Sequence, residues 1–124
     1  MSRAPILPEI VRQHAEMAAF LWTVYDRHLL YPDENPDMDE LRVARLLARL
    51  EAHLDGLRVA EEDGKRIALE RYQEFPESGE LFVVRMLSTD NPPNLHELDP
   101  VRTRAYLLDT LARARSTIGP AGKL

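Results

Sequence analysis

The residues of this chain best suited to chemistry are four histidines, His14, His28, His53 and His96. His14 and His28 are 14 residues apart, which on a helix places them on one face but about 21 Å apart along the axis, too far to share a metal ion. His53 and Asp55 form the closest imidazole–carboxylate pair, but residues two apart on a helix point in different directions. No second histidine lies three or four residues from His53, as a helical zinc site requires. The spacing therefore predicts no metal and no cofactor.

His14 and His53 become neighbours only if the first two helices pair antiparallel, in which case Glu16 or Asp55 could join them. A hydrogen-bonded structural pair is the favoured interpretation of that contact. The alternative is a small helical metal-dependent hydrolase that uses His14, His53 and Asp55.

The other chemical groups give no sign of an active site. The serines fall at a terminus, at a cap or at helix ends, and none lies on the strained turn of an activated nucleophile. Gly64 and Gly79 are isolated, so no phosphate-binding loop is present. Cysteine is absent, which excludes disulfides and thiolate metal sites and fits a reducing compartment. We therefore expect a protein without enzymatic activity.

The charge of the chain points to a protein partner. A net charge of -5 argues against nucleic-acid binding, which calls for a basic surface. The acidic residues gather in two segments, and we expect them to contact a basic partner such as a toxin domain: Asp33, Glu34, Asp37, Asp39 and Glu40, then Glu61, Glu62 and Asp63. No stretch approaches the roughly 20 apolar residues of a membrane span, and the first residues do not form a signal peptide, so we expect a cytoplasmic protein.

The element that organises the chain is a helix expected from Pro8 to about Leu30. Its centre, residues 17–22, is apolar at six consecutive positions, so more than one side of the helix should be covered. Phe20 and Trp22 are expected in the core, and the alternative is an interface anchor that packs against a second copy of the chain. The inner face is expected to hold Ile10, Val11, Ala18, Leu21, Tyr25 and Leu29.

A second helix should follow the proline-containing loop 31–37 and run to about Ala60. Asp37 or Asp39 can cap it, and Glu40 would complete a capping box with Asp37. Gly56 lies inside the pattern, where it indicates either close packing against a neighbour or the end of the helix. The apolar stripe contains Leu41, Val43, Ala44, Leu46, Leu47, Leu50, Leu54 and Leu57.

Three shorter helices are expected after it. Residues 61–64 should interrupt the pattern, and the next helix must stop before Pro76. Ser78 should cap a segment through Ser88 that fits either a strand or a buried helix, and we favour the helix because no second strand exists to pair with it. The last helix should begin at Asp99 and Pro100 and reach about residue 116.

The chain as a whole, 1–124, is therefore expected to be a single all-α domain of about five helices, with 1–7 and 117–124 flexible. A long antiparallel hairpin should be followed by shorter hairpins, and residues 64–88 have the length and form of one HEAT-like unit.

Three stretches resemble a known family: residues 10–22, residues 53–60, and Gly64 with residues 68–70. They are similar to the N-terminal region of an uncharacterised proteobacterial family with HEAT-like repeats, over roughly residues 6–88. The resemblance implies an accessory protein encoded beside type VI secretion effectors, and it carries no catalytic residue. It therefore implies an adaptor, chaperone or immunity protein that binds an effector or toxin.

Overall fold

The computed structural model describes residues 7–89 together with 101, 102, 105, 106 and 109. Every regular element in this part of the chain is helical: α1 (Pro8–Leu30), the 3-10 turn η1 (Pro32–Glu34), α2 (Glu40–Val59), α3 (Glu61–Glu74) and α4 (Ser78–Ser88). The expected all-α fold is confirmed, and residues 78–88 form a helix. Residues 101, 102, 105, 106 and 109 are also helical. The rest of the expected last helix and, except for Leu7, the ends expected to be flexible lie outside the described residues.

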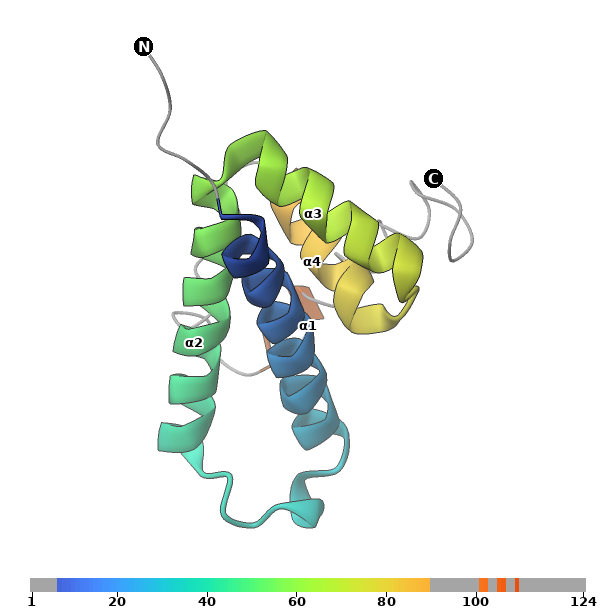
Figure 1. The fold of residues 1–124 in the computed structure, drawn as a ribbon. Coiled ribbons are helices and arrows are strands. Elements are labelled where there is room, and N and C mark those ends of the chain that lie inside the picture. The colour runs from blue at the N-terminus through green and yellow to red at the C-terminus, as the bar shows by residue number, and fades with distance from the viewer. Residues whose placement is uncertain (1–6, 90–100, 103–104, 107–108, 110–124) are drawn as a thin grey trace.

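The long hairpin consists of α1 and α2, and the shorter pair α3 and α4 packs against it (Figure 1). α1 contacts each of the other three long helices, which makes it the centre of the fold. Pro8 occupies the first helical turn, where its missing N–H removes no hydrogen bond. The connection between α1 and α2 projects from the end of the hairpin away from the α2–α3 junction (Figure 1). We call this connection and the helix ends beside it, residues 30–41, the tip.

The core is an apolar cluster drawn from all four helices. Trp22 is 3% exposed and stacks on Phe82 with ring centroids 5.5 Å apart. Phe20 is 59% exposed, and Ile10 is exposed as well, so their expected place in the core was wrong. Six consecutive apolar residues cover more than one full turn of 3.6 residues, so one of them faces away from the neighbouring helices.

α2 begins where its acidic cap predicts. Asp39 is the N-cap residue, and its side chain accepts a hydrogen bond of 2.9 Å from the backbone N–H of Arg42. The expected stripe from Leu46 to Leu57 is buried, whereas Leu41 and Ala44 are exposed, because the first turn of α2 extends beyond the core.

Two expected boundaries were wrong. Residues 61–64 form the first turn of α3, so Ala60 alone separates α2 from α3. Acidic side chains stabilise the positive end of a helix, which accounts for a first turn that contains Glu61, Glu62 and Asp63. The cap of α4 is Glu77, and Ser78 is the first helical residue.

Gly79 allows α4 to approach α1 closely. A Cβ atom at this position would lie 2.6 Å from the carbonyl oxygen of Ala19 and 2.9 Å from Oγ1 of Thr23. Only a residue without a side chain fits there, so Gly79 sets the separation of the two helices.

Candidate functional site

The structure brings His14 of α1 and His53 of α2 together, as antiparallel pairing of the two helices predicted. Their Nδ1 atoms are 3.0 Å apart. The ring centroids are 5.2 Å apart. This separation is longer than the Nδ1–Nδ1 distance by about twice the distance from a ring centre to its nitrogen, so the two nitrogens point toward each other. This is the geometry of an N–H···N hydrogen bond.

The same geometry does not suit a metal centre, because two ligand nitrogens must converge on an ion instead of facing each other. Asp55 forms an ion pair of 2.8 Å with Arg58, and Glu16 forms one of 3.3 Å with Arg71. Within the described residues, no three histidine or acidic side chains are grouped to hold an ion. The structure thus joins His14 to His53 but brings neither expected carboxylate to them.

Both rings of the pair are half-buried between α1 and α2. A Cβ atom on Gly56 would be 2.7 Å from the ring of His14, so the expected close packing of this glycine is confirmed. Burial lowers the pKa of His53, and the nearby His14 and Arg49 lower that pKa further because like charges repel. A shallow groove of about 230 Å³ adjoins the pair, lined by Leu7, Ile10, Val11, His14, Gly56, Val59 and Ala60.

Five of the eight expected partner-binding residues lie at the tip, and all five are exposed. Glu34 accepts hydrogen bonds of 2.8 and 3.0 Å from Nη2 of Arg27. Asp39 caps α2 and lies 3.8 Å from Arg42. Asp33, Asp37 and Glu40 form no side-chain ion pair with the described part of the chain, so they retain uncompensated negative charge.

Exposed apolar side chains accompany these carboxylates, and the sequence did not single them out as partner-binding residues. Leu30, Tyr31 and Leu41 are each more than half exposed. Leu30 and Tyr31 directly precede Pro32, which ends the helix, and this position could have indicated that they face solvent. Tyr31 also borders a groove of about 300 Å³, which is lined by Val24, Arg27, His28, Tyr31, Glu34, Asn35 and Met38.

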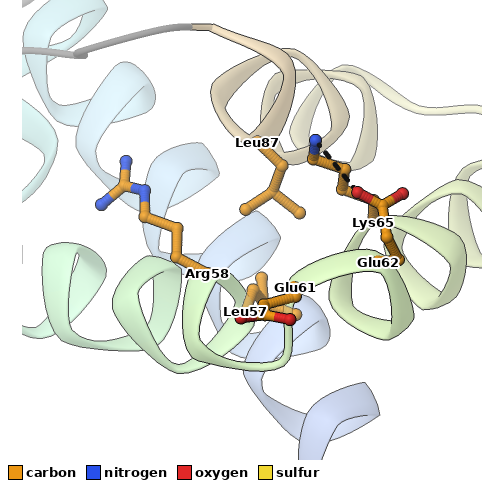
Figure 2. Close-up of a pocket in the computed structure, with 6 residues that line it drawn as sticks. All are labelled: Leu57, Arg58, Glu61, Glu62, Lys65 and Leu87. Carbon is orange, nitrogen blue, oxygen red and sulfur yellow. Dashed lines mark ion pairs between the residues drawn. The ribbon is translucent and has the colours of Figure 1, made fainter.

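The other three expected residues, Glu61, Glu62 and Asp63, lie at the opposite end of α2. The 20 residues of α2 span about 30 Å at the helical rise, so the two acidic segments are separate surfaces. Glu62 lies 3.6 Å from Lys65, and Asp63 lies 3.4 Å from Arg66. Figure 2 shows the groove at this junction, with Leu87 of α4 beside the Glu62–Lys65 ion pair.

No helix in the described part of the chain has both the length and the apolar character needed to cross a membrane. Comparisons of the whole chain with protein families, with curated proteins and with solved structures found no match.

Proposed function

We propose that this chain is a protein-interaction module without enzymatic activity, which binds a basic protein partner through its tip. The tip surface consists of the carboxylates of Asp33, Asp37 and Glu40 and the apolar side chains of Leu30, Tyr31 and Leu41. The observation that carries the proposal is the exposure of these apolar side chains beside carboxylates that form no ion pair with the described residues.

The two kinds of side chain support different parts of binding. Uncompensated carboxylates attract a basic partner and raise the rate of association, which falls as salt screens the charges. Exposed apolar and aromatic side chains supply the area that leaves water in the complex, and tyrosine is common among residues that dominate binding energy. Within the described residues, the two histidines that meet are bonded to each other, which favours binding over catalysis.

The identity of the partner is proposed from the sequence resemblance to proteins with HEAT-like repeats. That resemblance supports a cytoplasmic adaptor, chaperone or immunity protein for a type VI secretion effector or toxin. A basic toxin domain is the partner whose charge complements the tip surface.

The test begins with co-expression of the chain and the product of the neighbouring gene, followed by co-purification. In the resulting complex, Asp33→Lys combined with Asp37→Lys should weaken binding by at least about tenfold at low salt and flatten the salt dependence of the affinity. Asp39 is left unchanged because its loss would remove the cap of α2, at about 1 kcal/mol. Circular dichroism and thermal unfolding check that the variant is folded.

Glu62→Lys is the control for each single charge reversal, because it reverses one charge in the first turn of α3, beyond the far end of α2. It should leave the affinity unchanged. If Glu62→Lys weakens binding and the tip variant does not, the contact lies at the α2–α3 junction and the tip proposal is wrong. Failure to co-purify with any neighbouring product argues against the function itself.

A structural homodimer is the second candidate, and the exposed ring of Phe20 on α1 favours it. A large exposed aromatic side chain on the central helix is the kind of group that a second copy of the chain could cover.

A further inference from the structure

We propose that the His14–His53 hydrogen bond is a proton-sensitive latch that holds the first two turns of α1 on α2 and opens when both imidazoles are charged. The inference is independent of the proposed function, because His14 lies in the first two turns of α1 and His53 in the last two turns of α2, at the end of the hairpin opposite the tip.

The hydrogen bond restricts the protons that the pair can carry. An Nδ1–H on one ring must donate to a lone pair on Nδ1 of the other ring. A first added proton can reside on the donor ring without breaking this contact. A second added proton would leave two N–H groups facing each other across 3.0 Å between two positive rings, and the contact would be lost.

The side chains around the pair would not stabilise its doubly charged state. Gly56 lies against the His14 ring, which limits movement of the ring toward α2. Arg49, on the same helix as His53, adds positive charge. No carboxylate in the described part of the chain forms an ion pair with either ring, and the lining of the adjoining groove is otherwise apolar.

The latch matters because little else holds this end of α1. From Pro8 to His14, Val11 is the one buried side chain and His14 is the one half-buried side chain, while the other five are exposed. Separation of the two rings would therefore leave the first turns of α1 attached mainly through Val11.

The direction of the pH effect follows from His53. Because its folded-state pKa is lowered below 6.5, the unfolded or opened chain binds more protons in the interval between the two values. The stability contributed by the pair is therefore complete above about pH 6.5 and declines as the pH falls through the lowered pKa of His53. Opening of the first turns should increase about tenfold for each unit by which that pKa is lowered.

NMR of the imidazole nitrogens in the full chain tests the hydrogen bond directly. Isolated neutral histidine favours the Nε2–H tautomer, whereas the pair requires the Nδ1–H tautomer on one ring. We expect one Nδ1–H ring near pH 7.5 and titration of His53 below its usual range. Two Nε2–H rings that titrate independently would overturn the proposal.

Hydrogen exchange of the backbone amides in residues 11–17 tests the latch itself. After correction for intrinsic exchange, the wild-type protein should open more at about pH 5 than at about pH 7.5. His53→Gln keeps a hydrogen-bonding side chain that does not titrate, so this difference should disappear. His28→Gln removes a histidine of α1 that lies outside the pair, and it should leave the difference intact. If His53→Gln keeps the wild-type pH difference, the latch does not exist, and the NMR experiment decides the question should the variant fail to fold.

Discussion

Glu80 of α4 is a charged residue in the described core and is 8% exposed. Its counter-ion, Arg71 of α3, also pairs with Glu16 of α1. Nε of Arg71 donates to Glu80 over 3.4 Å, and Nη1 of Arg71 donates to Glu16 over 3.3 Å. One guanidinium therefore joins α1, α3 and α4. Burial raises the pKa of Glu80, and the attraction of Arg71 only partly offsets that increase.

The raised pKa of Glu80 predicts how this residue contributes to the free energy of unfolding as the pH changes. Because its folded-state pKa is raised, the folded protein binds more protons than the unfolded chain between 4.5 and the raised value, and the contribution of Glu80 declines as the pH rises through that interval. Glu80→Gln should therefore gain stability relative to the wild type as the pH rises from 4.5 through the raised pKa of Glu80. Denaturant unfolding at several pH values measures this difference.

Glu16→Gln is the control, because Glu16 pairs with the same Arg71 but its side chain is much more exposed than that of Glu80. Its stability relative to the wild type should not follow the trend predicted for Glu80→Gln. A Glu80→Gln difference that stays constant over the same pH range would contradict the assignment.

The sequence predicted single residues well where one local rule decides the outcome. Asp39 caps α2 and Pro8 starts α1 because a capping side chain and a proline act within one turn. The contact between His14 and His53 followed from antiparallel pairing alone. The role of Glu80 could not be predicted, because it depends on Arg71, which comes from another helix.

At the scale of the elements, the close contact of α4 with α1 predicts how much unfolding free energy is lost when a methyl group is added at Gly79. Gly79→Ala places a Cβ atom 2.6 Å from the backbone oxygen of Ala19, which cannot move as freely as a side chain. Overpacking costs about 1–3 kcal/mol and exceeds the gain of up to about 1 kcal/mol from the higher helix propensity of alanine. We expect a net loss of unfolding free energy in denaturant titrations. Gly56→Ala is the comparison, because the atoms that oppose it belong to the side chain of His14 and not to the backbone, and a larger loss there would contradict this ranking.

The four described helices were predicted, whereas the junction between α2 and α3 and the cap of α4 were not. Proline and the apolar period gave the ends of α1 and α3, because both act on the backbone locally. The junction at Ala60 was missed because Glu61, Glu62, Asp63 and Gly64 resemble a loop in composition. In the structure the acidic residues stabilise a helix start, and Gly64 is buried in the same turn. The separation of the two acidic surfaces was available from the sequence, since a helix of known rise connects them.

At the scale of the whole molecule, Phe20 lies on the outside of the helical bundle, whereas Trp22 lies in its core. Phe20→Ser should change the free energy of unfolding by less than about 0.5 kcal/mol, whereas Trp22→Ala should lose about 3–5 kcal/mol.

Light scattering of the wild type and of Phe20→Ser tests the homodimer. A wild-type mass that rises with concentration, together with a variant that stays monomeric, would support it. A mass that does not change with concentration would exclude it.

The central position of α1 has a consequence for synthesis of the chain. The helices that cover α1 all follow it in the sequence, and the last of those described ends at Ser88. Trp22, Leu21 and Tyr25 therefore emerge from the ribosome well before the side chains that will shield them from water. Until α4 has been synthesised, the nascent chain exposes an apolar helical surface, which is the kind of segment that general folding chaperones bind.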